Sequence, residues 1–238
     1  MPQNVLITGG TSGIGLALAD AYTARGDSVA VCGSSAGSVS RFADAHPNAL
    51  AIQADVTDPD ARVRMLSAIQ ERFGHLDVLI NNAGSFVERD FTAGDASDDL
   101  ERELDLNFSA PIHLTAAALV RWPAMTEVVF ITAGYALVSP KRAPTYGAAK
   151  SGLHGFADGL RRQLAPTGTH VLEVLPPLVD TPMNATATGK KLPPSEIATA
   201  TIRALADRRS MALPGSTRYL PALLRIAPNT IRRFVANT

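Results

Sequence analysis

The sequence predicts a single-domain α/β protein, with a doubly wound parallel sheet of seven strands and helices on both faces. Three observations support this prediction. Short runs rich in Val, Ile and Leu alternate with helix-length segments, which is the pattern of repeated βαβ units. The runs show little polar alternation, as expected of strands covered on both faces. No run contains proline, which favours central positions in the sheet.

Each expected strand is a short apolar run. In order they are Val5–Thr8, Ser28–Cys32, Ala49–Ala54, Val78–Ile80, Val128–Thr132, Val171–Leu175 and, from a weaker pattern, Ser210–Leu213. Each expected helix has apolar residues at helical spacing. These helices are Gly13–Arg25, Pro59–Phe73, Leu100–Arg121, Tyr146–Ala165 and Pro194–Arg208. Right-handed crossovers then place the strands in one sheet. No repeat or linker divides the chain, so one domain is expected over 1–238.

Two segments interrupt this rhythm. Ser85–Asp99 is polar and loop-like, and Leu178–Leu192 is rich in Thr, Gly and Pro. The second segment, the substrate loop (178–192), follows a strand end, where doubly wound sheets bind ligands. It is either a mobile lid over a site or a long surface connection.

Composition narrows the classes of protein and partner. The 238 residues are 46% hydrophobic and 18% charged, enough to bury a full core. The 22 basic and 22 acidic residues balance, which argues against a nucleic-acid partner. The single cysteine, Cys32, permits no internal disulfide and is expected to be a buried, inert thiol. No apolar run has the length of a membrane span. A soluble, cytoplasmic protein is expected.

The histidines do not predict a metal site, because none of the five has a partner at helical i, i+4 spacing. His113 and His154 fall on expected helices near the site described below. We expect packed or surface histidines there rather than substrate contacts.

The tail Arg218–Thr238 interleaves apolar residues with Arg225, Arg232 and Arg233. Such a pattern fits a membrane surface, a cap over a substrate site, or a subunit contact. Pro221 and Pro228 divide the tail into short helices and its basic residues are few. We therefore expect a C-terminal cap (about 215–238) or a subunit contact, and no stable membrane association.

A glycine-rich turn joins the first expected strand to the first expected helix. Residues 8–15 read T-G-G-T-S-G-I-G. Glycines here allow a tight turn and a close approach of the backbone to a phosphate, and the N–H groups that open the helix favour a pyrophosphate. The turn therefore predicts dinucleotide binding. The residues expected to contact the cofactor are Gly9, Thr11, Ser12, Gly13, Ile14 and Gly15.

The residues after the second strand normally select the nicotinamide cofactor. An acidic residue there binds the ribose 2′-OH, whereas Arg accepts a 2′-phosphate. Residues 32–37 read C-G-S-S-A-G and contain neither. The hydroxyls of Ser34 and Ser35 are available to a 2′-phosphate, and Arg41 is near enough in sequence to reach back. NADP(H) is therefore favoured over NAD(H).

Tyr146 and Lys150 are one helical turn apart, so they share one face of a helix. A phenol has an unperturbed pKa of about 10, and a cationic neighbour favours its ionised form. The pair therefore predicts a tyrosine that acts as a general acid or base. By itself, Y-x-x-x-K is a weak motif, and the motifs before it carry the argument.

Together these motifs resemble the short-chain dehydrogenase/reductase family over nearly the whole chain. The cofactor turn is followed by Asp55-Val56 after the third strand, N-N-A-G at residues 81–84, Asn107 in L-N-F, and the Tyr146–Lys150 pair. Residues 77–82, residues 176–181 and the tail look like the DltE-like branch of the family. The resemblance implies a Rossmann fold.

The resemblance also implies roles for individual residues. The implied catalytic residues are Tyr146 and Lys150, with Asn107 holding a proton-relay water. The further residues implied to contact the cofactor are Ser34, Asp55, Val56, Asn82, Ala83, Gly84, Pro176, Val179 and Thr181, together with Tyr146 and Lys150. Homodimers or homotetramers that pair the helices of 100–121 and 146–165 are implied as well. Pro177 departs from the family's usual glycine but should leave binding intact.

The main departure is Ala133, thirteen residues before Tyr146, where the family usually has a serine that binds the substrate carbonyl. A methyl group cannot donate that hydrogen bond. Three explanations stay open. Thr132 or Ser139 supplies a hydroxyl in place of the serine, although Thr132 should point to the other face of its strand. Alternatively, the serine was replaced to trap a complex, or the activity of the chain needs no serine. Ala133 and Tyr135 are the expected substrate contacts, although Tyr135 also fits simple packing.

The expected function is hydride transfer between NAD(P)(H) and a small or medium-sized carbonyl or alcohol, with a rate impaired or altered because of Ala133. The alternative is a redox-silent member of the family, such as an isomerase, a dehydratase or a cofactor-dependent binding protein. Ala133 favours the alternative, whereas Tyr146, Lys150 and Asn107 favour the redox enzyme.

Overall fold

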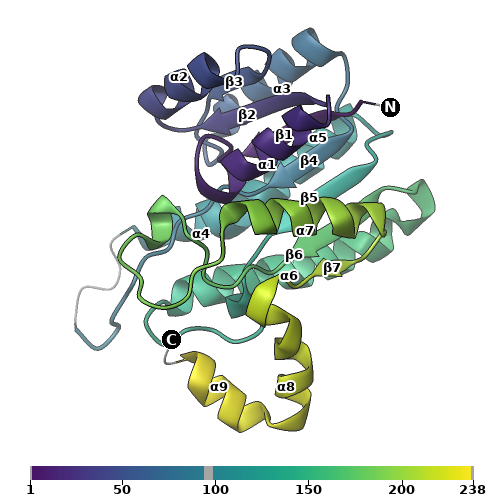
Figure 1. Cartoon of the computed structure of the whole chain (residues 1–238). Helices are drawn as coiled ribbons and strands as arrows, with labels where there is room; N and C mark the ends of the chain where they lie inside the picture. The colour runs from purple at the N-terminus through teal and green to yellow at the C-terminus, as the bar shows by residue number, and fades with distance from the viewer. Residues whose placement is uncertain (1, 94–98, 237–238) are drawn as a thin grey trace.

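A computed structural model describes residues 2–93 and 99–236 and contains one seven-stranded parallel sheet (Figure 1). The strand order is β3-β2-β1-β4-β5-β6-β7. The strands are β1 (Asn4–Thr8), β2 (Ser28–Gly33), β3 (Leu50–Gln53), β4 (Val78–Asn81), β5 (Glu127–Ile131), β6 (His170–Val174) and β7 (Met211–Ala212). The strand order reverses between β1 and β4. The carboxyl ends of these two strands therefore form the switch point at which such folds bind ligands. The predicted doubly wound sheet is confirmed.

Helices cover both faces of the sheet (Figure 1). The long ones are α1 (Gly13–Ala24), α2 (Ala36–Ala45), α3 (Pro59–Phe73), α5 (Ala110–Arg121), α6 (Pro144–Leu164) and α7 (Pro194–Ala206). Buried residues of α1, α2 and α7 pack on one face of the sheet, and those of α3, α5 and α6 pack on the other.

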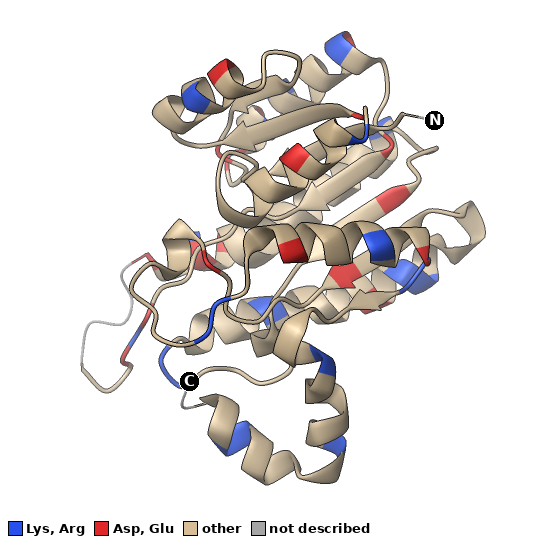
Figure 2. Ribbon diagram, viewed as in Figure 1, with Lys and Arg blue, Asp and Glu red and all other residues tan. Residues whose placement is uncertain are grey.

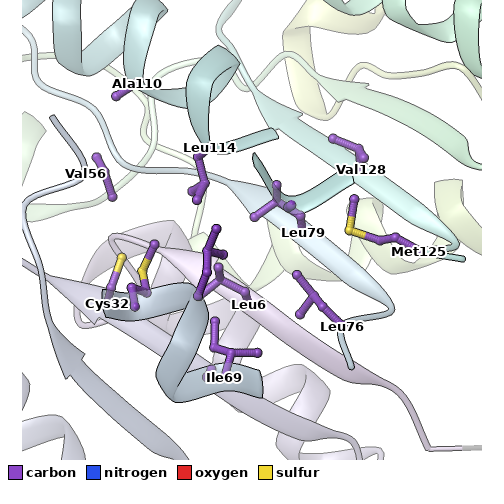
Figure 3. Packing of buried hydrophobic residues seen from close by; sticks show 14 of the residues in the cluster. Leu6, Cys32, Val56, Ile69, Leu76, Leu79, Ala110, Leu114, Met125 and Val128 are labelled. Carbon is purple, nitrogen blue, oxygen red and sulfur yellow. The ribbon is translucent and has the colours of Figure 1, made fainter. Parts of the chain in front are cut away.

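Strand alternation creates these two cores. In β2, Val29 and Val31 join the core beneath α1 and α7, whereas Ala30 and Cys32 join the core beneath α3 and α5. Figure 3 shows the second core, in which Cys32 packs among aliphatic side chains. Burial raises the pKa of the Cys32 thiol to about 12, so the predicted inert thiol is consistent with its environment.

Helix α2 is an element that the sequence pattern does not predict. Its sequence, AGSVSRFADA, contains one glycine and two serines, which are weak helix formers. Tertiary packing compensates, because Phe42 is buried and stacks on His46 with ring centroids 4.2 Å apart.

The predicted helix Leu100–Arg121 contains a break in its hydrogen-bond pattern. Helix α4 (Leu100–Leu104) passes through a π-helical segment, η1 (Asp105–Ser109), into α5. Segments of this kind occur mostly as single turns and often at functional sites. Asn107 lies in this one.

The tail folds into short helices, as its prolines predict. A 3₁₀ segment, η5 (Gly215–Tyr219), leads into α8 (Leu220–Ile226) and α9 (Pro228–Ala236). Both helices carry arginine but no acidic residue (Figure 2). The end of α9 lies against the loop that precedes α6, since the Lys141 N–H donates to the carbonyl of Ala236 at 2.8 Å. Residues 237–238 of the predicted cap, and residues 94–98 of the predicted 85–99 loop, lie outside the described residues.

None of the helices over residues 2–93 and 99–236 combines the length and apolarity needed to cross a membrane. Within the same described ranges, no group of three or more His, Cys, Asp or Glu residues is arranged to hold a metal ion.

Candidate active site

The glycine-rich turn leaves β1 and enters α1 with its backbone exposed to the cleft. Gly13 has a φ of +54°, a conformation that favours glycine. A Cβ atom on Gly15 would lie 2.3 Å from the carbonyl oxygen of Gly9, so only glycine lets the helix begin this close to the strand. The turn is thus shaped for an anion at the start of α1.

The N-N-A-G segment ties β4 to β1 beside this turn. The Asn82 side chain donates to the carbonyl of Thr8 at 2.8 Å, and the Thr8 hydroxyl accepts from the N–H groups of Asn82 and Ala83 at 3.0 Å each. Asn81 donates to the Thr115 hydroxyl on α5 at 3.0 Å. These hydrogen bonds hold β1, β4 and α5 together at the switch point.

A cleft of about 390 Å³ runs along this end of the sheet. It brings together nearly every site residue that the sequence predicts, namely Gly9, Thr11, Ser12, Gly13, Ile14, Ser34, Asp55, Val56, Asn82, Ala83, Gly84, Asn107, Ala133, Tyr146, Lys150, Pro176, Val179 and Thr181. Gly15 and Tyr135 are not on its wall. Gly15 lies behind the turn, and Tyr135 packs beside Tyr146.

Hydroxyls gather where the cleft passes the end of β2. Ser34, Ser35 and Ser38 line this end, and Ser38 is held by its bond to the Ser35 carbonyl at 2.9 Å. Arg102 also lines the cleft and lies 3.4 Å from the Asp55 carboxylate. Ser38 and Arg102 are not among the predicted site residues, because the sequence pattern does not predict α2 and Arg102 is distant in the chain from the other residues of this cleft end. Arg41 is not on the cleft wall.

Asp55 is oriented by its neighbour Thr57, whose N–H and hydroxyl donate to it at 3.0 and 2.7 Å. Partial burial opposes ionisation, but these bonds and the charge of Arg102 lower the pKa of Asp55 below its ordinary value. The carboxylate is therefore fixed and charged at the adenosine end that the family resemblance assigns to it.

Tyr146 and Lys150 are both buried on one face of α6, as their spacing predicts. The Lys150 ammonium lies 5.7 Å from the centre of the Tyr146 ring and donates to the carbonyl of Ile131 at 3.1 Å. Burial lowers the pKa of Lys150 to about 8, against an opposing effect of Glu173.

The effect of this lysine on the phenol differs from the sequence prediction. Burial, with smaller contributions from Tyr135 and Glu103, raises the pKa of Tyr146 above its ordinary value. The Lys150 ammonium bonds to the backbone carbonyl of Ile131 rather than to the phenol, and it is not among the groups that shift the pKa of Tyr146. In this structure Tyr146 is therefore a protonated acid.

Asn107 is fully buried at the π-helical segment and holds the loop after β4. Its amide donates to the carbonyls of Ser85 and Glu103 at 2.9 and 3.0 Å, and its oxygen accepts from the Ser85 N–H at 3.3 Å. A Cβ atom on Gly84 would lie 2.7 Å from that oxygen. The π-helical turn thus brings Asn107 against the N-N-A-G segment, next to Lys150.

A buried carboxylate that sequence reasoning missed lies behind these residues. Glu103 on α4 accepts from the Arg89 guanidinium at 3.1 Å, from the Thr145 hydroxyl at 2.7 Å and from the Val87 N–H at 3.3 Å. It joins the loop after β4 to the start of α6, directly before Tyr146. Nothing in the local sequence distinguishes Glu103 from a surface residue.

A second buried carboxylate, Glu173 on β6, lies behind Lys150. It accepts from the Thr132 hydroxyl at 2.7 Å and pairs with His154 Nδ1 at 2.7 Å. His154 is therefore a packed histidine, as predicted, and His113 is exposed. An acidic residue in the middle of an apolar strand is the signal that could have revealed this group.

Ala133 is buried at the end of β5, with its methyl group beside Tyr146. The two hydroxyls considered as substitutes do not replace a serine there. Thr132 donates to Glu173 and to the carbonyl of Val174, as its opposite strand face predicts. Ser139 is exposed, packs against the backbone of Gly147 and does not line the cleft.

The substrate loop is anchored at its base. Val179 and Leu192 form a parallel bridge, and Asn184 donates to the Val179 carbonyl at 2.9 Å. Within it, Pro182, Met183 and Asn184 line the cleft, and Met183 is 48% exposed.

Sequence comparison shows what this chain is similar to. The model of the short chain dehydrogenase family matches residues 3–191. The Bacillus subtilis oxidoreductase DltE is 37% identical over 193 residues, which cover 79% of this chain and 76% of that protein. A Staphylococcus epidermidis oxidoreductase is 30% identical over 206 residues, with 84% and 89% covered.

Solved structures share the fold. A short-chain dehydrogenase from Streptomyces avermitilis superposes with a TM-score of 0.86 at 25% identity and covers 98% of this chain and 97% of its own. A Burkholderia cenocepacia short chain dehydrogenase in complex with NADP gives 0.89 at 20% identity, covering 100% and 98%. A Burkholderia phymatum homologue of the fold, in complex with NAD, gives 0.85 at 20% identity, covering 100% and 96%. The chain belongs to the short-chain dehydrogenase/reductase family of NAD(P)-dependent oxidoreductases.

Proposed function

We propose that the protein is an NADP(H)-dependent reductase or dehydrogenase acting on a small or medium-sized carbonyl or alcohol. One observation carries this proposal: Tyr146, Lys150 and Asn107 line the same cleft as the glycine-rich turn. A protein that only binds the cofactor has no use for a buried phenol and ammonium at that place.

The residues present fit the cofactor. The turn at Gly9–Gly15 lines the cleft and offers backbone N–H groups to the pyrophosphate, and a Cβ atom on Gly13 would lie 3.1 Å from the side chain of Thr181, another cleft residue. The adenosine would be held by Asp55 and Val56, and the adjoining ribose would be held by the N-N-A-G segment. The nicotinamide half would be held by Pro176, Val179 and Thr181. When bound, the nicotinamide supplies or accepts a hydride at the substrate carbon.

The chain's own residues then move the proton. Tyr146 donates its hydroxyl proton to the carbonyl oxygen during reduction and recovers it in the reverse direction. Lys150 provides the positive charge that stabilises the resulting phenolate and would hold the ribose hydroxyls. Asn107 keeps the loop after β4 in place and continues the relay towards solvent. Ala133 and the aromatic group around Tyr135 are proposed to face the substrate.

A carbonyl and alcohol panel tests the proposal. Purified protein is first titrated with NADPH and NADH by fluorescence, and then assayed with acetophenone, benzaldehyde, cyclohexanone, ethyl acetoacetate and the matching alcohols by nicotinamide absorbance. Turnover of at least one compound is expected. Cofactor binding without turnover, also in Ala133→Ser, would favour a redox-silent protein, the second candidate that Ala133 supports.

Cofactor choice is expected to reverse in Ser34→Asp. The new carboxylate would face the 2′-phosphate and accept from a ribose 2′-OH. Repulsion of about 1–2 kcal/mol predicts a loss of about tenfold in kcat/KM with NADPH and a gain with NADH. Ser38→Ala, which removes a hydroxyl without adding charge, is the matched variant. An unchanged preference in Ser34→Asp would show that the 2′-position lies elsewhere.

The pH dependence of reduction follows from Lys150. Its pKa of about 8 means that the free enzyme loses this charge as the pH rises through about 8. Tyr146, with its raised pKa, stays protonated over the same range. We expect kcat/KM for reduction to be highest below about pH 8 and to fall above it. Initial rates between about pH 6 and about pH 10, with NADPH binding measured at each pH, check this. A rate that rises through pH 8 would contradict it.

The substrate loop is proposed to close over the nicotinamide, and the tail (215–238) to cap the substrate. Thr217 and Leu220 support the cap, since both pack against Gly134 next to Ala133. A homodimer or homotetramer through α4, α5 and α6 is proposed by analogy with the family, and α5 leaves Val120 83% exposed. We also propose a cytoplasmic location with no nucleic-acid or stable membrane partner. Light scattering during gel filtration measures the oligomeric state.

A further inference from the structure

The end of β5 has a chemical gap that the rest of the site does not fill. Carbonyl reduction builds negative charge on the substrate oxygen, and a second hydrogen-bond donor beside Tyr146 stabilises it. Ala133 offers only a methyl group. The Thr132 hydroxyl bonds to Glu173 and Val174, Ser139 does not line the cleft, and the Thr217 hydroxyl donates to the carbonyl of Pro214 at 2.7 Å. A donor at this place must come from another residue.

Tyr135 is the hydroxyl-bearing side chain that packs with Ala133 and Tyr146. The three residues belong to one small cluster, together with Phe86 and Ala143. The rings of Tyr135 and Tyr146 meet edge to face with centroids 6.4 Å apart. Burial is the main cause of the raised pKa of Tyr146, and the nearby Tyr135 contributes to it.

A cation lies next to the Tyr135 phenol. The Arg142 guanidinium packs over the Phe86 ring at 4.9 Å and pairs with Glu88. Burial would lower the pKa of Arg142, but interactions with the Tyr135 phenol and with Glu88 raise it. Arginine only donates hydrogen bonds, so in any bond between the guanidinium and this phenol the phenol oxygen is the acceptor. The hydroxyl hydrogen of Tyr135 is left to donate to a third group, and the adjacent cation makes it a better donor.

We propose that Tyr135, polarised by the nearby Arg142 and packed beside Tyr146 just outside the wall of the cofactor cleft, donates the second hydrogen bond to the substrate oxygen and so replaces the serine hydroxyl absent at Ala133. The proposal rests on the reductase function above and makes Tyr135 a catalytic residue. Tyr146 transfers its proton to the oxygen, whereas Tyr135 keeps its own and stabilises the developing charge.

A set of four variants tests this assignment. Tyr135→Phe is expected to lower kcat about 100-fold with little change in KM, the usual effect of removing one such donor. Ala133→Ser alone is expected to change kcat little, because the donor is already present. In the Ala133→Ser/Tyr135→Phe double variant, the serine should restore at least about tenfold of the loss.

Tyr22→Phe is the matched control, since it removes a phenol hydroxyl that is buried in the core under α1 without a hydrogen-bond partner among the described residues. Its kcat should equal that of the wild type. If Tyr135→Phe also retains wild-type kcat, or if Ala133→Ser accelerates the wild type as much as it does Tyr135→Phe, the assignment to Tyr135 is wrong.

A readout without turnover separates this proposal from the reductase function. Acetophenone labelled with ¹³C at its carbonyl is bound to Tyr146→Phe with NADPH, and the carbonyl resonance is compared with that in Tyr146→Phe/Tyr135→Phe. A downfield shift that is present in Tyr146→Phe and lost in the double variant supports Tyr135 as the donor. This holds even if the wild type reduces no carbonyl, an outcome in which only the reductase function fails. Equal shifts in both variants overturn the donor. Absence of carbonyl binding to the wild-type complex overturns both proposals.

Discussion

Tyr146→Phe is expected to lower kcat about a thousandfold while NADPH binds with its wild-type affinity. General acid–base groups contribute about 10²–10⁴ in rate, and Tyr146, which α6 places with Lys150 in the cleft, is the proposed acid. The substitution removes only a hydroxyl from a ring that packs against Phe86 with centroids 5.0 Å apart. The fold and the cofactor cradle should therefore remain intact.

Single-turnover rates and a fluorescence titration of NADPH measure the two quantities separately. Circular dichroism and the thermal midpoint of the variant should match those of the wild type, which excludes misfolding as the cause of a loss. Comparable rates in wild type and Tyr146→Phe would show that this tyrosine is not the acid. The redox-silent function, which Ala133 favours, would then be the better interpretation.

Arg89→Met is expected to destabilise the fold by about 3 kcal/mol, which lowers the thermal midpoint by about 6–12 °C. Arg89 and Glu103 lie 3.1 Å apart with side chains only 5% and 1% exposed. Methionine fills much of the arginine volume but leaves the Glu103 carboxylate buried without its cation. Because Glu103 also holds Thr145, the start of α6 should loosen and kcat should fall.

Arg64→Met provides the comparison. Arg64 pairs with Asp58 at 3.6 Å, but both side chains are largely exposed, and exposed pairs contribute about 0–1 kcal/mol. Thermal and urea unfolding of both variants measure the difference. Equal small effects at the two sites would mean that Glu103 takes up a proton or water in place of its lost partner.

Local patterns predict most of this fold, for physical reasons that particular residues illustrate. The strands are apolar because both of their faces are buried, as Val29, Ala30 and Val31 show on opposite sides of β2. Helix α2 could not be predicted in the same way, because a glycine and two serines weaken its helical pattern and Phe42 is its one buried residue. The π-helical turn at Asn107 also has no local signal, since it depends on bonds to Ser85, which lies far away in the chain.

The residues of the candidate site likewise fall into those that local patterns predict and those that they do not. Motifs with fixed spacing, such as the glycine turn and the Tyr146–Lys150 pair, could be predicted because one element positions each of them. The groups behind them could not. Glu103, Arg89 and Thr145 come from three separate segments, and only the folded chain shows that they meet. The protonated state of Tyr146 likewise depends on burial, which spacing does not report.

The glycine-rich turn has a consequence for cofactor binding at different ionic strengths. It presents backbone dipoles to a pyrophosphate, whereas the charged side chains on the cleft wall among the described residues are Asp55, Arg102 and Lys150. Added salt screens exposed side-chain charges such as that of Arg102 more strongly than dipoles held against a buried anion. On the proposal that the cofactor is NADP(H), salt should therefore weaken the contacts of the cofactor with Arg102 before it weakens those with the turn. The preference for NADPH over NADH would narrow with increasing ionic strength if Arg102 is one of the groups that hold the 2′-phosphate.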